Sequence, residues 1–201
     1  MVLPPSGSDK NPTPLTDEQI KQATIGELKP HDAPIVLVEY DPAWPEHYAG
    51  EAKRIRAALG SRALQIEHIG STSVPGLIAK PIIDILLVVA DSADEPSYVP
   101  AMEAAGYVLR IREPDWHQHR LFKGSTININ LHVFSSGSTE IERVLTLRNW
   151  LRENPEDREL YAEAKRDLAR QKWHYVQNYA DAKSRVIEAI ISRAHASKGH
   201  V

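Results

Sequence analysis

The apolar run from Ile82 to Ala90, interrupted only by Asp84, is the feature that most constrains the fold. The run is too short to cross a membrane, and Pro81 at its start favours a central strand that is buried on both faces. An unpaired carboxylate in such a strand is costly, so Asp84 needs a cation, a metal ion or strong hydrogen-bond donors. Lys80, on the same face of the strand, could be a purely structural partner; the alternative is that Asp84 binds a metal ion or a substrate amine.

A second strand is predicted at residues 127–134, because apolar residues alternate there with Asn128, Asn130 and His132. The two-residue period of a strand places these three polar side chains on one face. Taken alone, the pattern is typical of an edge strand with one solvent-facing side. If this strand lies next to Asp84, however, His132 becomes a candidate ligand in the same site.

The remaining pattern predicts an α/β (α+β) fold. Short β-rich segments alternate with two amphipathic helices in the first part of the chain, and the pattern becomes helical from about residue 138. This order predicts a mixed β-sheet with flanking helices and a C-terminal helical layer. The further strands are predicted at residues 35–40, 63–69, 107–111 and 119–123, and the helices at 44–59, 98–105, from about 141, around 160–168 and at 175–194.

The chain has 201 residues, a length that predicts one domain with a tail. Residues 1–33 are rich in proline, serine and glycine and are predicted to form a flexible N-terminal tail. A short helix is expected within it, because Thr16 resembles a helix N-cap. The folded domain is predicted to span residues 34–196, followed by a short C-terminal tail at 197–201.

Composition excludes several classes of protein and of site. The 24 basic and 27 acidic residues give a formal net charge of −3, which provides no electrostatic case for nucleic-acid binding. The absence of cysteine excludes disulfides, thiol catalysis and cysteine zinc sites. The N-terminus has no secretory pattern, and no apolar run is long enough to span a membrane. The expected location is therefore the cytoplasm, without a membrane or nucleic-acid partner.

Gly70, Ser71, Thr72 and Ser73 follow the strand predicted at residues 63–69. Glycine lets the backbone approach a ligand closely, successive N–H groups at such a turn can form an anion-binding nest, and the hydroxyl groups add donors. These features suit a phosphate group. A strand exit with ordinary Ser/Thr turns is an equally common interpretation of the same residues.

Together these stretches resemble the GrpB family. The most specific part of the match reads His-Ile-Gly-Ser-Thr-Ser-Val-Pro-Gly-Leu at residues 68–77 and Lys-Pro-Ile-Ile-Asp-Ile at residues 80–85. The resemblance implies a nucleotidyltransferase-like fold, similar to that of the polymerase-β superfamily. By that likeness, Gly70 and Ser71 would bind a nucleotide triphosphate, and Asp84 would bind a divalent metal ion, magnesium or manganese. The resemblance covers about residues 36–194, with further matches at 131–133, 147–152, Pro155, Tyr161 and Lys165.

Phosphoryl transfer by two metal ions needs a cluster of carboxylates, and this chain has an incomplete set of them. The positions two residues before and after Asp84 are apolar, and the polar face predicted for residues 127–134 carries no acid. In one surviving mechanism, a single divalent ion is held by Asp84 and His132, together with His68 or Glu67. Histidine ligation would shift the preference toward manganese, zinc or another transition metal.

The other surviving mechanism uses no metal. Asp84 would act as a base or bind a substrate cation, while Lys80, Arg120 and Arg148 neutralise phosphate or carboxylate groups. The C-terminal helices could add a substrate wall, because Arg148 and Lys165 belong to segments that match the family. The alternative for these two side chains is a solvated helix surface, where arginine and lysine are most often found.

Three hypotheses on function follow. The first is a nucleotidyltransferase-like enzyme that transfers a nucleotidyl or related group to a small-molecule acceptor, with Asp84, His132 and Lys80 as catalytic residues. The second is a non-catalytic module that binds a nucleotide or an anionic metabolite, which the missing carboxylates favour. The third is a different metal-dependent reaction of a small molecule in the same pocket, because a fold does not determine a reaction. The expected partners are a nucleotide and a small-molecule substrate.

Overall fold

The computed structural model describes residues 15–28, 34–124 and 126–198. Five strands form one sheet in the order β1-β2-β5-β4-β3. β2 and β5 are parallel, and the other neighbouring pairs are antiparallel. The predicted α/β fold with a mixed sheet is therefore confirmed. The strands are β1 (Gln65–Ile69), β2 (Ile83–Val89), β3 (Val108–Glu113), β4 (His119–Lys123) and β5 (Ile129–Ser135).

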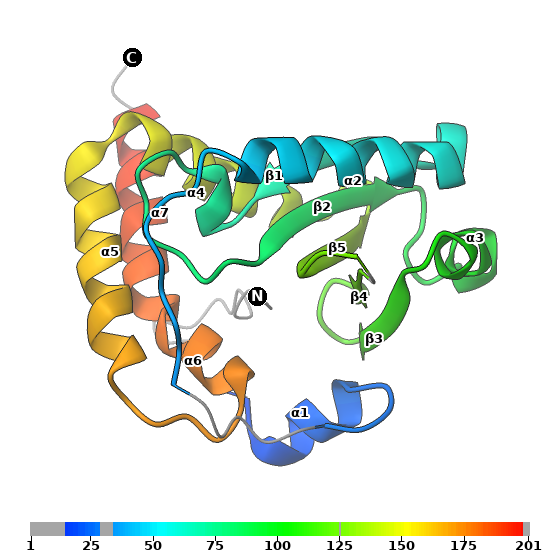
Figure 1. Ribbon diagram of the computed structural model, residues 1–201, viewed down its shortest axis with the longest axis horizontal. Helices are drawn as coiled ribbons and strands as arrows, with labels where there is room; N and C mark the ends of the chain where they lie inside the picture. The colour runs from blue at the N-terminus through cyan, green and yellow to red at the C-terminus, as the bar shows by residue number, and fades with distance from the viewer. Residues whose placement is uncertain (1–14, 29–33, 125, 199–201) are drawn as a thin grey trace.

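The helices lie on both faces of this sheet, as Figure 1 shows. α2 and α3 pack on one face, and α4 packs on the other, with α5 and α7 beside it. This arrangement confirms the predicted C-terminal helical layer. The helices are α1 (Asp17–Ala23), α2 (Trp44–Leu59), α3 (Val99–Ala104), α4 (Thr139–Glu153), α5 (Pro155–Ala169), α6 (Val176–Ala182) and α7 (Ser184–Lys198). Within the described residues, no helix combines the length and the apolarity that a membrane span needs.

The central strand β2 is buried along its whole length, as its apolar run predicts. Ile85 and Leu87 face the core under α2, whereas Leu86 and Val88 pack with Val144 of α4 on the other face. Because β2 lies between β1 and β5 and both faces are covered, apolar residues occupy successive positions. The polar Asp84 at the start of this strand is therefore the exception that the structure has to accommodate.

The strand predicted at residues 127–134 is β5, and it is not an edge strand. It lies between β2 and β4, and its polar residues Asn130 and His132 are buried. Its alternating pattern therefore marks one apolar face under α2 and one polar face inside the protein.

Two predicted elements differ in the structure. Residues 35–40 form no strand. Val38 alone pairs, in an isolated bridge with Ala79, because the segment around Ala79 is a turn-rich loop and offers no longer ladder. The single helix predicted at 175–194 is divided into α6 and α7 at Lys183. There the Ser184 hydroxyl donates a hydrogen bond to the carbonyl of Asp181, so that a side chain satisfies a backbone acceptor at the break.

The described part of the predicted N-terminal tail packs against the domain. α1 begins with a capping box between Thr16 and Gln19, as the N-cap pattern predicts. Ile20 is buried, and the backbone N–H of Ile25 donates to the carbonyl of Arg110 in β3 (2.8 Å). In Figure 1, α1 lies beside α6. Residues 15–28 are thus folded onto the sheet, while the rest of the predicted tail lies outside the described residues.

We expect the two faces of β2 to dominate stability. Ile85 is 0% exposed and Val36 is 62% exposed, so Ile85→Ala should lower the free energy of unfolding by about 2–5 kcal/mol. The matched control Val36→Ala should change the free energy by less than about 0.5 kcal/mol. Urea denaturation followed by tryptophan fluorescence measures both changes, and similar costs for the two variants would contradict this account of the core.

Candidate functional site

Asp84 lies at the start of β2, buried, with only 6% of its surface exposed. In the parallel register it pairs with Asn130 of β5, whose amide Nδ2 donates a hydrogen bond to Asp84 Oδ1 (2.7 Å). Lys123 of β4 in turn donates to the carbonyl oxygen of the Asn130 side chain. Burial raises the pKa of Asp84, but donors and positive charges around the carboxyl lower it more, so that the pKa lies below its ordinary value.

Gly70 brings the turn after β1 directly against Asp84. Its φ of 69° and ψ of −172° lie in a region that only glycine adopts readily. A Cβ atom built there would lie 2.9 Å from the Cβ of Asp84 and closer still to its carboxylate. The residue must therefore be glycine, both for its backbone conformation and for its contact with the acid.

The predicted phosphate-binding turn is a short 3₁₀ helix at Ser71–Ser73. Ser73 donates its hydroxyl to the carbonyl of Gly70 (2.6 Å), and Thr72 donates its hydroxyl to the carbonyl of Ile82 (3.3 Å). These two side chains are buried and hold the turn against the start of β2. Ser71 is the member of the turn whose hydroxyl faces the C-terminal helices.

Three lysines surround this turn and Asp84. Lys165 of α5 donates to the Ser71 hydroxyl (3.1 Å) and to the carbonyl of Ile78. Lys80 and Lys183 lie over the ring of Tyr179, with Nζ 5.6 Å and 4.6 Å from its centroid. Burial lowers the pKa of Lys80 to about 8 and that of Lys183 to about 7, and it also holds the pKa of Lys165 well below the ordinary value.

These groups line a small cavity of about 20 Å³ that adjoins a larger one of about 420 Å³. Lys80, Asn130, Tyr179 and Lys183 border both. The larger cavity lies between α1, α6 and the strands β3 to β5, and its wall combines cations with apolar and aromatic side chains. The small cavity is lined by Leu37, Ser71, Thr72, Lys80, Ile82, Asp84, Asn130, Lys165, Tyr179 and Lys183. We call the two together the lysine cleft.

His132 extends the polar face of β5 next to Asp84. Its Nε2 lies 3.7 Å from Asp84 Oδ1, and burial lowers its pKa to about 3. The three groups on which the sequence-based hypotheses depend, Asp84, the Gly70–Ser73 turn and His132, therefore converge. His132 and Asp84 border a second small cavity together with Ser71.

The arginines named from the sequence hold the fold together. Arg148 of α4 donates to Glu67 Oε2 (2.8 Å) and to the carbonyl of His68 (3.0 Å). Its neighbour Arg152 donates twice to the carbonyl of Ser73 (2.9 and 2.7 Å). These contacts dock α4 onto β1 and the turn. Arg148 also borders the cavity of His132 and Asp84.

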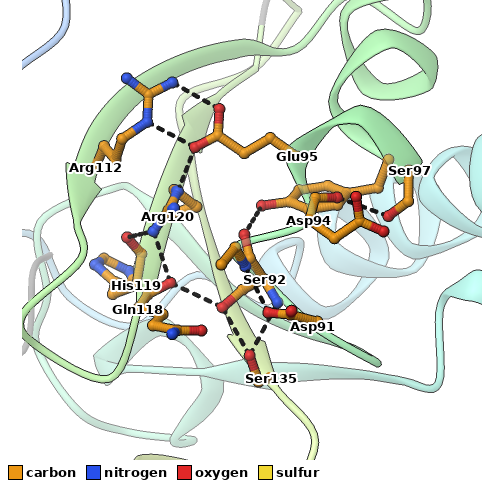
Figure 2. Close-up of polar contacts among 12 residues, drawn as sticks. Asp91, Ser92, Asp94, Glu95, Ser97, Arg112, Gln118, His119, Arg120 and Ser135 are labelled. Atoms are coloured by element: carbon orange, nitrogen blue, oxygen red, sulfur yellow. Dashed lines mark hydrogen bonds and ion pairs between the residues drawn. The ribbon is translucent and has the colours of Figure 1, made fainter.

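Arg120 lies on the other face of the sheet from Asp84, because it pairs with Val133, one position after His132. Its guanidinium donates to Glu95 (2.6 Å) and to the carbonyl of Gln118 (2.9 Å). Figure 2 shows these contacts, in which Arg120 and Arg112 share the Glu95 carboxylate. The structure thus places Arg120 away from the lysine cleft, where it fastens a loop to β4.

His68 and Glu67 do not join Asp84. His68 pairs with Ile85 in the register of β1 and β2, which places it on the opposite face; its ring stacks on Tyr48, with centroids 4.8 Å apart. Glu67 is paired with Arg148. Within the described residues, no three histidine, aspartate or glutamate side chains converge as a metal site. The donor set does not fit a two-magnesium centre, which needs clustered carboxylates.

Sequence reasoning missed Lys183 and Tyr179, whose ring lies under the ammonium groups of Lys80 and Lys183. In the sequence, Lys183 lies within a segment predicted to be one continuous helix, whereas in the structure it lies at the break between α6 and α7. The burial of Lys165, with Nζ over the Tyr161 ring at 4.7 Å, explains the fourfold spacing of these two residues. The sequence already indicated this pair, since both residues match the family and residues four apart share a helix face.

The GrpB protein family model matches residues 34–193. This chain belongs to the GrpB family. A UPF0157 protein of Halalkalibacterium halodurans is 60% identical over 195 residues, which cover 97% of this chain and 100% of that protein. The crystal structure of the conserved protein GrpB from Enterococcus faecalis has a TM-score of 0.72 and 32% identity, covering 82% of this chain and 100% of that one. A distant match is the Cid1 poly(U) polymerase, with a TM-score of 0.44 and 10% identity over 64% of this chain and 45% of that one.

We expect Gly70→Ala to be more costly than Gly76→Ala. Both glycines have a positive φ, but the added methyl group meets Asp84 at position 70 and nothing within 4 Å at position 76. Gly76→Ala should cost about 1–2 kcal/mol from backbone strain, and Gly70→Ala should cost more. In an Asp84→Ala background the extra cost should shrink, because the carboxylate is removed, but not disappear, because the Cβ at 2.9 Å remains; a double-mutant cycle of unfolding free energies measures the difference. Equal costs in both backgrounds would refute the contact.

Proposed function

We propose that this GrpB protein binds a phosphate-bearing small molecule in the lysine cleft, with a nucleotide as the first candidate. The observation that carries the proposal is the convergence of Lys80, Lys165 and Lys183 around one wall of the cleft at the Ser71 turn. Placing cations together inside a protein is unfavourable unless anions balance them. A multiply charged anion, which several ammonium groups can contact at once, fits this arrangement.

Phosphate is the anion that the local chemistry favours. Lysine binds phosphate as a compact point charge, and the hydroxyl of Ser71 adds a neutral donor beside Lys165. The adjoining cavity of about 420 Å³ falls within the usual range for small-molecule sites. Its wall includes Ile20, Tyr175 and Tyr179, which provide apolar and aromatic surface. A ligand with a phosphate end and an uncharged ring system matches both parts of the cleft.

Nucleotidyl transfer to a small acceptor is the second candidate function, and the contact between Asp84 and the Gly70 turn favours it. In this view Asp84 and His132 would handle the acceptor, and Lys80 would neutralise phosphate charge. A bound divalent ion would have Asp84 and His132 as its protein ligands and would supply charge neutralisation. Release of pyrophosphate from a nucleoside triphosphate with a panel of amine and alcohol acceptors tests transfer directly; binding without release would favour a binding module.

We expect Lys165→Met to weaken nucleotide binding at least tenfold, because a charged hydrogen bond contributes about 1.5–3 kcal/mol. Methionine keeps the length of the buried side chain, so the fold should survive. The matched control is Arg166→Met, one residue further along α5, where the guanidinium pairs with Glu159 on the surface. Calorimetry with ATP and with pyrophosphate measures the affinities.

Thermal unfolding gives an independent readout of the same binding. At 100 times its dissociation constant, a ligand should add about 2.7 kcal/mol to the stability of the wild-type protein. If neither nucleotides nor inorganic phosphates change the melting temperature, with or without magnesium or manganese, the proposed function is wrong.

We also expect affinity for ATP to fall as pH rises from 7.5 to 9.5. ATP is fully ionised over this range, whereas Lys183 and Lys80 lose their protons above their lowered pKa values of about 7 and about 8. Each lysine that must carry a proton for binding should reduce the affinity by about tenfold per pH unit above its pKa. Calorimetry at several pH values without divalent ions measures this slope. A constant or rising affinity would contradict the role of the lysines.

A further inference from the structure

Four side chains form a row across the polar face of the sheet, and the proposed phosphate binding does not use most of it. Glu113 of β3 is followed by His119 of β4, His132 of β5 and Asp84 of β2. The Glu113 carboxylate lies 2.6 Å from His119 Nδ1, and His119 Nε2 lies 3.1 Å from His132 Nδ1. His132 Nε2 then faces Asp84 Oδ1 at 3.7 Å, beyond hydrogen-bond distance.

The two imidazoles of this row are fully enclosed. His119 is 0% exposed and His132 is 1% exposed. The rings of Trp116 and Phe134 pack on His119, with centroids 5.2 Å and 4.8 Å away. Burial lowers the pKa of both histidines, although Glu113 acts in the opposite direction on His119. The geometry also points to one proton on each ring, because an N–H at His132 Nε2 would donate to the Asp84 carboxylate, whereas the two atoms lie 3.7 Å apart and Nε2 has no hydrogen-bond partner among the described residues.

The hydrogen bonds of neutral imidazoles fix where those protons lie. The Glu113 carboxylate accepts, so His119 carries its proton on Nδ1 and leaves Nε2 bare. That bare nitrogen accepts from His132, which therefore carries its proton on Nδ1 as well. His132 Nε2 is then an acceptor, and it faces the carboxylate of Asp84, which also accepts. The bare Nε2 of His132 therefore needs a donor, and none of the described side chains supplies one.

The space for such a donor is present. A cavity of about 20 Å³, enough for one water molecule, is bordered by Ser71, Asp84, His132 and Tyr161. Within the part of the chain that the structure describes, His132 Nε2 and the hydroxyl of Tyr161 are buried and have no hydrogen-bond partner. A water molecule there would have two acceptors for its hydrogens and one hydroxyl donor for its oxygen.

We propose that Glu113 and His119 are positioning residues that hold His132 in its Nδ1–H tautomer, and that one water molecule occupies the cavity between His132, Asp84 and Tyr161. The row ends at Glu113, which borders the larger cavity of the lysine cleft. The tautomer of His132, and with it the ring nitrogen that faces Asp84, is thus set from the β3 edge of the sheet. Glu113 and His119 hold His132 in this way whether or not a phosphate group binds in the lysine cleft.

Nitrogen-15 NMR of histidine-labelled protein tests the tautomer. Spectra at pH 7, with signals assigned through His119→Gln and His132→Gln, should show protonated Nδ1 and bare Nε2 for both residues. Glu113→Leu removes the acceptor and should move the His132 proton to Nε2, where it donates to Asp84. Glu113→Gln keeps a carbonyl acceptor and should retain the wild-type tautomers, and Glu103→Gln on the surface of α3 should change nothing.

Each NMR result bears on the proposal. A wild-type His132 that carries its proton on Nε2, or on both nitrogens, would overturn it. Retention of the Nδ1–H tautomer of His132 in Glu113→Leu, in a variant whose amide spectrum shows a folded protein, would overturn the role of Glu113. Both readouts are independent of any ligand, so a failed search for nucleotide binding would leave them unaffected.

Crystals of the full chain test the occupant of the cavity. Without divalent ions, we expect one density peak within hydrogen-bond distance of His132 Nε2, Asp84 and the Tyr161 hydroxyl. A parallel soak in manganese chloride should give no anomalous peak at this position. An empty cavity would contradict the proposed water molecule. An anomalous peak between Asp84 and His132 would show that a metal ion occupies the position, and it would also contradict the proposal.

Discussion

The burial of one carboxylate organises this end of the molecule. Asp84 lies in a strand that is otherwise apolar, and with 6% of its surface exposed it is largely withdrawn from bulk water. The sheet supplies Asn130 as a donor, and the turn that follows β1 approaches so closely that only glycine fits beside the acid. The position of the turn, the identity of Gly70 and the polar face of β5 all follow from the need to surround this group.

Successive side chains of a strand point to opposite faces of the sheet, so one face can form the stabilising core while the other borders the site. The face under α2 and α3 is an apolar core that includes Ile85, Leu131 and Val133. The opposite face is apolar where α4 covers it and polar where it borders the lysine cleft. A shift of one residue in the register of β5 would place His132 in the core and an apolar residue in the site. The alternation of polar and apolar residues in this strand therefore maintains both the apolar core and the polar face of the site.

The two kinds of cation on the C-terminal helices have different tasks. Arg148 and Arg152 use their planar, multiply donating groups on carbonyl and carboxylate oxygens and thereby dock α4 onto the turn. Lys165 and Lys183 are single point charges, buried next to tyrosine rings on the wall of the small cavity that Asp84 also borders. Docking by arginine fixes the wall of the cleft, and the lysines give that wall its charge.

Much of the fold could be predicted from local sequence patterns, because the periods of strands and helices depend on neighbouring residues. The sequence indicated the buried central strand, the alternation of β5, the glycine-serine turn and the helical C-terminal layer. The pairing of those elements was not, because pairing depends on contacts between distant segments. Only the tertiary structure placed Arg120 on the far face, turned His68 away from Asp84, broke the last helix at Lys183 and aligned Glu113 with His132. Periodicity shows which residues share a face, whereas the order of strands and the packing of helices decide which faces meet.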